Sequence, residues 1–305
     1  MRKRPLTEQA HPETGRLDQL PTLDMLRLIN SADAETAAAV ARELPRIAAA
    51  VEAIATALDR GGHLVYVGAG TSGRLGVIDA SECPPTFNVS PGLVRGIIAG
   101  GPAALTRSVE AAEDDPAAGA RDLAESGVTK GDAVVGISAG GRTPYVLGAV
   151  AKARELGAIT GGISCTPASE LSQAVDFPME PAPGPEILTG STRLRAGTAT
   201  KMVLNMISTG VMVRLGYVYG NLMVNLQPAN RKLEDRARRM IEQAAGVSAE
   251  RAAALFEQSG RNVRAAIVME KLAVSREQAE QRLAAARGRI RAALSLSPAD
   301  QGKNG

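Results

Sequence analysis

The sequence predicts an α/β protein, in which an open parallel sheet lies between two layers of helices and a small all-helical bundle follows. From Leu64 onward, short apolar runs rich in β-branched residues alternate with helical patterns, as parallel sheets require. Residues 230–294 are instead typical of three or four short helices. We therefore divide the chain into an N-terminal arm with helices (1–50), a sheet domain (51–228) and a C-terminal helical domain (229–305).

The N-terminal part is expected to be an extended polar arm over residues 1–20, followed by two helices. The first helix spans 24–30, with Thr22 as its cap. The second spans 34–58 and carries apolar residues at helical spacing. Pro45 should kink this second helix or split it in two, because proline removes a helical hydrogen bond.

The sheet domain is expected to contain five strands with helices between them. One helical segment spans about 102–126, with a break expected at Pro116, and a long helix spans about 198–215. In the C-terminal part, 249–259 and 263–272 have the clearest helical patterns. The predicted strands are 64–67, 94–99, 133–138, 159–164 and 177–180.

A glycine loop follows the first strand directly and opens a helix. Gly70 lies in it beside two hydroxyl residues, Thr71 and Ser72. Glycines let the backbone approach a ligand, and free N–H groups at a helix start attract an anion. The loop also matches the dinucleotide pattern G-x-G-x-x-G, but no acid ends the second strand to hold a ribose. A phosphate monoester is the better match, and a tight turn that binds nothing is the remaining alternative.

A second loop of the same kind follows the third strand. It contains Ser138, Gly140, Arg142 and Thr143. Ligands of open parallel sheets bind beyond the carboxyl ends of the strands, so two such loops can converge on one anion. The pair indicates a phosphorylated small molecule. Ser191, in a hydroxyl-rich and arginine-rich segment before the long helix, either joins this pocket or belongs to an ordinary helix-capping loop.

The residue inventory excludes several classes of catalytic site. Cys83 and Cys165 are too few for a disulfide framework or a four-ligand zinc site. His11 and His63 lie far apart in sequence, which argues against a Ser-His-Asp triad or a histidine metal site. We therefore expect no metal, and acid–base chemistry must be performed by carboxylates.

Two glutamates are candidates for that chemistry. Glu82 stands before Pro84, just past the predicted end of the helix that the first loop opens, where proline fixes the backbone. Glu113 lies in an acidic stretch of the next helical segment. Either glutamate by itself is more often a solvated surface acid. Together, two carboxyl groups in different environments can divide the acid and base roles, although sequence spacing does not show that they meet.

Charge and hydropathy favour neither nucleic acid nor membrane as a partner. No signal-peptide pattern and no apolar run long enough to span a bilayer is found. Residues 231–305 carry 15 basic against 9 acidic side chains, but the two signs are mixed and Phe256 is the one aromatic residue there. Solvated helix faces explain this balance better than a nucleic-acid surface.

Several runs of the sequence resemble the N-acetylmuramic acid 6-phosphate etherase family. These runs are GAGTSGRLG, DASECPPTF, GRTPYV and TGSTRLRAGTATKMVLNMISTG, with further likeness at TEQAHPETGRLDQL and NRKLEDRA. The resemblance covers nearly the whole chain. It implies a sugar isomerase (SIS) domain that binds phosphosugars, a C-terminal helical bundle, a cytoplasmic homodimer and no metal or organic cofactor.

The implied reaction converts N-acetylmuramic acid 6-phosphate to N-acetylglucosamine 6-phosphate and D-lactate by elimination followed by hydration, as part of cell-wall recycling. By resemblance, the glutamate of the SECPP run is an acid/base residue, which assigns Glu82 to protonation of the departing lactate. Glu113 is the corresponding partner in proton abstraction or water addition. An acid that keeps its proton at neutral pH requires burial beside apolar side chains.

The chain departs from the family pattern in the second loop, where Gly140 stands in place of a serine. We expect Ser138 to substitute, because residues two apart on a strand share a face, or the phosphate to rest on Thr71, Ser72, Thr143 and backbone N–H groups. Two other functions stay open: a non-catalytic phosphosugar-sensing SIS regulator and a sugar-phosphate isomerase. Against a transcription regulator, the alanine-rich N-terminal helices lack a basic recognition face.

Overall fold

The structure is a computed structural model that describes residues 5–107, 109–226 and 230–296. It separates into two compact units. One comprises Met1–Glu82 with Ser90–Val211, and the other comprises Cys83–Val89 with Met212–Gly305. The predicted boundary at residues 228 and 229 lies outside the described residues, so the division into 1–50, 51–228 and 229–305 stays a prediction.

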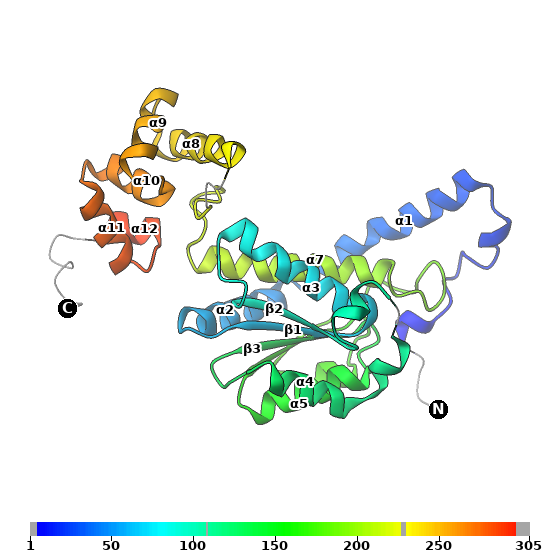
Figure 1. The fold of residues 1–305 in the computed structure, drawn as a ribbon. Helices are drawn as coiled ribbons and strands as arrows, with labels where there is room; N and C mark the ends of the chain where they lie inside the picture. Colours follow the sequence, from blue (N-terminus) through cyan, green and yellow to red (C-terminus); the bar gives the residue numbers. More distant parts are fainter. Residues whose placement is uncertain (1–4, 108, 227–229, 297–305) are drawn as a thin grey trace. The chain divides into compact units, whose positions relative to one another are not determined.

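The first unit contains the predicted parallel sheet (Figure 1). Its strand order is β2-β1-β3-β4-β5, and every neighbouring pair is parallel. The central strands β1 and β3 are buried along their whole length, which explains their unbroken apolar sequences. The strands are β1 Leu64–Gly68, β2 Val94–Ile98, β3 Ala133–Ile137, β4 Ile159–Ile163 and β5 Phe177–Met179.

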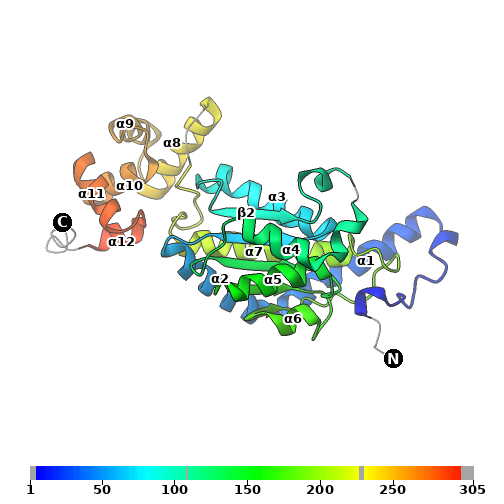
Figure 2. The same cartoon turned by 60° about the horizontal axis from the view of Figure 1, so that its bottom comes forward.

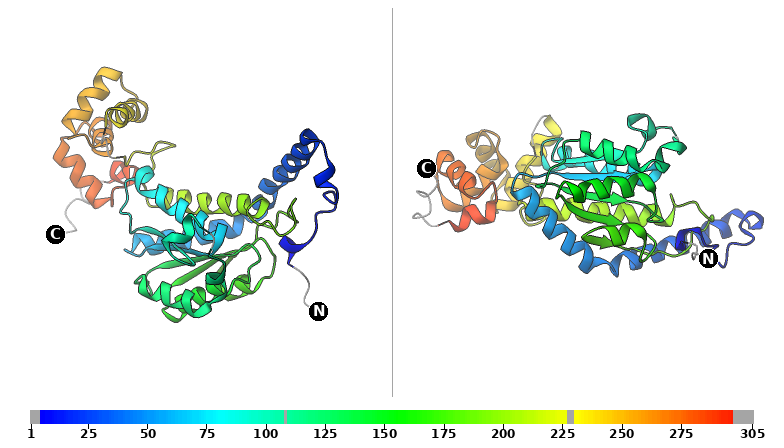
Figure 3. Two further views of the ribbon diagram at one scale, coloured as in Figure 1. Left: turned by 45° about the vertical axis from the view of Figure 1, so that its right-hand side comes forward. Right: turned by 90° about the horizontal axis from the view of Figure 1, so that it is seen from below.

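Helices cover both faces of this sheet (Figures 1 and 2). The helices α2, α3 and α7 lie on one face, and α4, α5 and α6 lie on the other, as the two views of Figure 3 also show. The α/β prediction with helical layers on both sides is therefore confirmed. These helices are α2 Leu44–Asp59, α3 Gly70–Phe87, α4 Pro116–Glu125, α5 Pro144–Glu155, α6 Glu170–Ala174 and α7 Arg195–Arg214.

Helices α4 and α5 cross at very close range through two glycines. A Cβ atom on Gly148 of α5 would overlap the carbonyl group of Pro116 in α4, and one on Gly119 of α4 would overlap that of Tyr145. Beneath this crossing, side chains of α5 such as Val146 pack with Val65 of β1 in a buried apolar cluster. The layer of helices on this face thus depends on backbone-to-backbone contact.

The N-terminal helices differ from the prediction. One helix, α1, spans Thr22–Ala41, so no break occurs between residues 30 and 34. The split expected at Pro45 is confirmed: α1 ends at Ala41, and Pro45 is the second residue of α2, a position where its missing N–H has no helical partner to lose. Thr22 lies inside α1 and is not its cap. The predicted extended arm contains two short 3₁₀ turns, η1 (Leu6–Glu8) and η2 (Leu17–Gln19).

The segment predicted as a helix over 102–126 is a helix only at its end. It forms two 3₁₀ turns, η3 (Pro102–Leu105) and η4 (Glu110–Asp114), before α4. Pro116 is the first residue of α4, and the Asp115 carboxylate caps it by accepting the Ala118 N–H at 3.0 Å. The interruption expected at Pro116 is therefore present, since Asp115 is extended and the proline starts a new helix.

The second unit contains five described helices, where the sequence indicated three or four. Four of them begin with a side-chain cap, from Asn230, Ser248, Asn262 and Ser275. Their apolar faces enclose Phe256, which is fully buried. No described helix of either unit combines the length and apolar character that a membrane span requires. The helices are α8 Arg231–Ala245, α9 Ala249–Gln258, α10 Val263–Leu272, α11 Arg276–Ala285 and α12 Ile290–Ser295.

Candidate functional site

The two predicted loops meet at the carboxyl edge of the sheet. Gly68, the last residue of β1, pairs in register with Ile137, the last residue of β3. The loops 69–73 and 138–143 therefore leave neighbouring strands at the same level. The strand on the other side of β1 ends there as well, since Gly68 also pairs with Ile98 of β2.

The first loop is a tight entry into α3. A Cβ atom on Gly68 would come within 2.6 Å of the Gly73 nitrogen, so packing alone requires glycine there. Gly70 begins α3 with a φ of 51° and has open space on its Cβ side. Thr71 and Ser72 are half-buried in the first turn, where backbone N–H groups have no helical acceptor. The outward part of the loop, Gly70–Ser72, has the groups that an anion site needs.

The second loop is a turn. The Gly141 N–H donates to the Ser138 carbonyl at 2.9 Å, and β3 already ends at Ile137. The premise that residues 138 and 140 share a strand face is therefore wrong. Ser138 is buried, and its hydroxyl pairs with the Thr143 hydroxyl at 2.8 Å. Gly140 is half-buried beside them.

Arg142, in the same loop, is exposed, and its Nε lies 4.0 Å from the Glu170 carboxylate. Thr143 precedes Pro144, the first residue of α5, and is half-buried. The loop thus directs one arginine toward solvent and α6 and keeps its two hydroxyls paired with each other.

The segment before α7 is organised by an acid that sequence reasoning did not select. Glu186 is fully buried, and its carboxylate accepts the Arg195 and Ala196 N–H groups, each at 2.9 Å. Burial raises the pKa of Glu186 above its usual value, although the two N–H donors act to lower it. Because Glu186 already occupies the start of α7, this helix N-terminus is closed to another anion. In the sequence Glu186 follows a proline-rich stretch and belongs to no recognisable motif, so no sequence pattern could have identified it as a buried acid.

Arg195 is also buried, so it does not face a pocket. Its guanidinium bonds the Pro185 carbonyl at 3.0 Å and the Glu35 carboxylate at 2.8 Å. Ser191 is half-buried in a turn in which its N–H donates to the Leu188 carbonyl at 2.9 Å. The start of α7 does adjoin the first loop, since a Cβ atom on Gly197 would lie 3.7 Å from Cγ2 of Thr71.

Both candidate glutamates are exposed in the chain. Glu82 lies within α3, because the helix continues through Pro84 and Pro85 to Phe87, so its expected place just past the helix end is wrong. Glu113 lies in the 3₁₀ turn η4. No hydrogen bond or ion pair among the described contacts joins the two. The burial that sequence reasoning required of a catalytic acid is not provided around either side chain.

One turn before Glu82, a buried acid anchors α3 to α7. Asp79 accepts the Asn205 amide at 2.7 Å and the Ser208 hydroxyl at 3.1 Å. Burial raises the pKa of Asp79, while Asn205, Tyr66 and Ser208 act in the opposite direction. This network fixes the part of α3 that carries Glu82. Sequence reasoning missed it, because its members are separated by more than a hundred residues.

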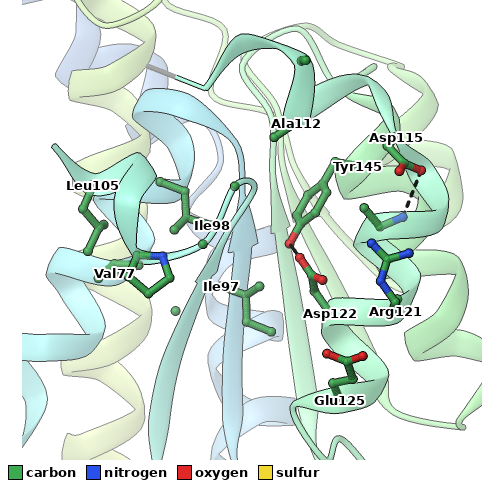
Figure 4. A pocket seen from close by; sticks show the side chains of 16 residues that line it. Val77, Ile97, Ile98, Leu105, Ala112, Asp115, Arg121, Asp122, Glu125 and Tyr145 are labelled. Atoms are coloured by element: carbon green, nitrogen blue, oxygen red, sulfur yellow. Dashed lines mark hydrogen bonds between the residues drawn. The ribbon is translucent and has the colours of Figure 1, made fainter. Parts of the chain in front are cut away.

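A cavity of about 750 Å³ opens beside β2, but none of the predicted site residues lines it (Figure 4). Its walls come from β2, η3, η4 and α4. Tyr145 closes one side and donates to the Asp122 carboxylate at 2.6 Å. Burial, together with Asp122, raises the pKa of Tyr145. Ala111, Ala112 and Asp115 line the cavity around Glu113, whose own side chain does not.

The described residues contain no grouping of three His, Cys, Asp or Glu side chains with the geometry of a metal site. The candidate site at the carboxyl edge of the sheet is therefore defined by backbone N–H groups and hydroxyls. Glu82 is not at this edge within one chain, because it lies about 18 Å along α3 from Gly70.

Comparison with known proteins first identifies the class. Residues 46–154 match the family model described as the glucokinase regulatory protein N-terminal SIS domain, and this range contains β1, β2 and β3 with the two loops. The fold is thus an α/β SIS fold. Solved structures similar to the chain include an Escherichia coli CFT073 protein in complex with A5P (TM-score 0.49, 16% identity, 66% of this chain and 97% of that one).

Curated relatives then identify the family. The N-acetylmuramic acid 6-phosphate etherase of Cronobacter sakazakii is 53% identical over 289 residues, which cover 95% of this chain and 97% of the relative. The etherases of Rubrobacter xylanophilus (54% identical, 95% of each chain) and Streptomyces avermitilis (52% identical, 96% of this chain and 94% of that one) are similarly alike. The chain belongs to the N-acetylmuramic acid 6-phosphate etherase family.

Proposed function

We propose that this protein is an enzyme, a carbon–oxygen lyase that cleaves the D-lactyl ether of N-acetylmuramic acid 6-phosphate. The products are N-acetylglucosamine 6-phosphate and D-lactate, and the setting is the cytoplasmic recycling of cell-wall sugars. The observation that carries the proposal is the 53% identity to a named etherase along 95% of the chain. Because the aligned region covers 95% of the chain, it includes both the loops at the sheet edge and the C-terminal helices.

The phosphate group is held at the carboxyl edge of the sheet. Gly70, Thr71 and Ser72 offer backbone N–H groups and two hydroxyls at the start of α3. The loop with Ser138 and Thr143 leaves the adjacent strand. These groups suit a phosphate monoester, which presents several oxygens to donors that converge from two loops.

Elimination followed by hydration accounts for the products. In the open-chain aldehyde the proton on carbon 2 is acidic, and a base removes it while the bond from carbon 3 to the ether oxygen breaks. Glu82 donates a proton to that oxygen as lactate leaves. Water then adds across the new double bond, its oxygen to carbon 3 and a proton to carbon 2. Glu113 assists the proton abstraction or the water addition.

A second copy of the chain supplies the enclosure that this chemistry needs. Glu82 and Glu113 are exposed in one chain, and acid–base catalysis works best where water is excluded. We propose a homodimer in which the partner subunit covers the sheet edge, with Ser191 beside the boundary between subunits. A phosphorylated amino sugar is the ligand, and no nucleic acid, membrane, metal or organic cofactor takes part.

The test is release of D-lactate from N-acetylmuramic acid 6-phosphate by the purified full-length protein. Glu82→Gln and Glu113→Gln should each reduce the rate by about 100-fold or more, the usual contribution of a general acid or base. Asp114→Asn and Glu125→Gln are matched controls, because each removes an exposed carboxylate to which no role in the site is assigned. They should keep the rate within about threefold, as neutral surface changes do.

Lactate release by Glu82→Gln at the wild-type rate would remove Glu82 from the mechanism and leave the reaction assigned. A specific observation favours a second function, since residues 46–154 match the SIS domain of a regulatory protein. A folded protein that binds the phosphosugar and releases no lactate would support the sensor. Interconversion of sugar phosphates without lactate would support an isomerase.

A further inference from the structure

Thr7, in the N-terminal turn η1, carries a hydroxyl with no partner. The residue is 0% exposed, and its Oγ1 has no hydrogen bond among the described residues. A hydroxyl enclosed by protein without an acceptor or donor is costly, so such groups in native proteins usually serve something. The question is which polar group lies within reach of it.

The hydroxyl of Thr7 lies over Gly140 in the second loop. A Cβ atom built on Gly140 would have Oγ1 of Thr7 at 3.9 Å and, apart from its two chain neighbours, no other described atom within 4 Å. A side chain at position 140 would therefore project into free space toward Thr7. The turn η1, more than a hundred residues away in sequence, thus places a hydroxyl on the side of the loop where residue 140 has none.

The neighbouring polar groups are already engaged or point elsewhere. Ser138 and Thr143 pair with each other at 2.8 Å, so they do not partner Thr7. The Glu8 carboxylate lies near Gly190, where a Cβ atom would be 3.5 Å from Oε2.

Thr7 is accordingly one of two buried hydroxyls without a described partner near the second loop. The other is Thr166, which follows Cys165, whose N–H donates to the Ala139 carbonyl at 2.9 Å. Of the two, only the Thr7 hydroxyl lies within 4 Å of a Cβ atom built on Gly140.

We propose that Thr7 is a phosphate-binding residue, whose hydroxyl donates to a phosphoryl oxygen of the sugar phosphate held at loop 138–143. It takes the place of a side-chain hydroxyl at Gly140. The inference rests on the proposed phosphosugar ligand. Since Thr7 is enclosed, the ligand reaches it when η1 shifts. The two backbone hydrogen bonds described for η1, from Glu8 to Pro5 (3.0 Å) and from Gln9 to Leu6 (3.2 Å), both lie within the N-terminal segment.

Binding of N-acetylglucosamine 6-phosphate, measured by calorimetry, tests the proposal without requiring catalysis. Thr7→Val should weaken binding about tenfold, equivalent to about 1.4 kcal/mol, and Thr7→Ser should stay within about twofold of wild type. Unphosphorylated N-acetylglucosamine, which lacks the group that Thr7 contacts, should bind both variants equally. Gly140→Ser in the Thr7→Val background should restore phosphosugar binding, because it returns a hydroxyl to the same space.

Thr36→Val is the matched control. Thr36 in α1 is also 0% exposed with an unpartnered hydroxyl, so the same chemical change removes the same kind of buried group. Both valine variants should raise the Tm of the ligand-free protein, by about 2–4 °C. A structural role alone would move Tm in both and leave ligand affinity unchanged in both.

Phosphosugar affinity within twofold of wild type in Thr7→Val would overturn the proposal, as would a wild-type protein that does not bind the phosphosugar. The outcome is separate from the etherase assignment. If the wild-type protein releases lactate and Thr7→Val does not change phosphosugar affinity, the etherase function stands and the role proposed for Thr7 is wrong. A protein that binds the phosphosugar through Thr7 but releases no lactate keeps this site and loses the function.

Discussion

Substitution of Gly148 by alanine should destabilise the protein through the crossing of α4 and α5. Alanine inside a helix is ordinarily more stable than glycine by about 0.5–1 kcal/mol. Here the added Cβ would overlap the carbonyl oxygen of Pro116 and lie 2.7 Å from its carbonyl carbon. Ordinary carbon contacts need roughly 3.5 Å, so the helices must separate by about 0.8 Å or more.

The cost of that separation should exceed the gain in helix propensity. Overpacking usually costs about 1–3 kcal/mol, and the upper end applies because a main-chain carbonyl cannot rotate away as a side chain can. We expect a net loss of about 2 kcal/mol, which lowers Tm by roughly 4–8 °C. Gly119→Ala, at the other contact of the same crossing, should behave alike, since its Cβ would lie 2.8 Å from the Tyr145 carbonyl carbon.

The assay is urea and thermal denaturation of the full chain, followed by circular dichroism. Gly131→Ala is the control, because the nearest atom to its Cβ would be Oγ1 of Thr129 at 3.8 Å, an ordinary contact. It should stay within about 0.5 kcal/mol of wild type. A Gly148→Ala protein as stable as the control would refute the close crossing and, with it, the position of the helix that starts at the second loop.

Three further predictions concern buried titratable groups. Asp132 is buried, which opposes ionisation, but hydrogen bonds from Thr129 and His63 lower its pKa below 3.8. The ionised Asp132 should therefore stabilise the folded state at pH values above 3.8, and this contribution should be lost as the pH falls below 3.8. Asp132→Asn should cost about 1–3 kcal/mol in urea denaturation at pH 7. Burial raises the pKa of Asp79 above 3.8, so the folded state keeps this proton to higher pH than the unfolded chain, and stability should fall as pH rises through that range. Asp79→Asn should therefore gain stability relative to wild type as pH rises above 3.8, and equal slopes of stability against pH in the two proteins would contradict this. Burial, with Glu186 nearby, raises the pKa of Cys165 to about 12, so iodoacetamide at pH 8 should label this thiol only after denaturation, as mass spectrometry can show.

The loop patterns illustrate how far local sequence extends toward a site. Glycines and hydroxyls after two apolar runs predicted two loops at one sheet edge, and the register of Gly68 with Ile137 places them there. The same patterns did not show that Ser138 and Thr143 pair with each other. Hydrogen bonding among loop side chains depends on the turn they form, and Ser138 lies past the strand end where the strand-face argument no longer applies.

Prolines gave correct boundaries at Pro45 and Pro116, where helices were expected to break, but a wrong one at Pro84 and Pro85. Pro116 begins α4, and Pro84 and Pro85 lie inside α3, so Glu82 is a helical residue. Proline favours the first turn of a helix and disfavours its interior, but packing can override that preference. The sequence rule therefore placed the end of α3 more than one turn too early, and Glu82 is a helical residue where a position past the helix was expected.

The sequence by itself determined the parallel sheet, its helical layers and the two loops, because buried strands need continuous apolar runs and tight strand-to-helix turns need glycine. Its family resemblance also named the chemistry. Only the tertiary structure decided that Thr7 lies over Gly140, that Glu186 closes the start of α7 and that α4 meets α5 through glycines. The first and third of these are contacts between residues distant in the chain, and the second depends on how the segment between Glu186 and Arg195 folds back. The free energy of such contacts depends on three-dimensional proximity that no local pattern records.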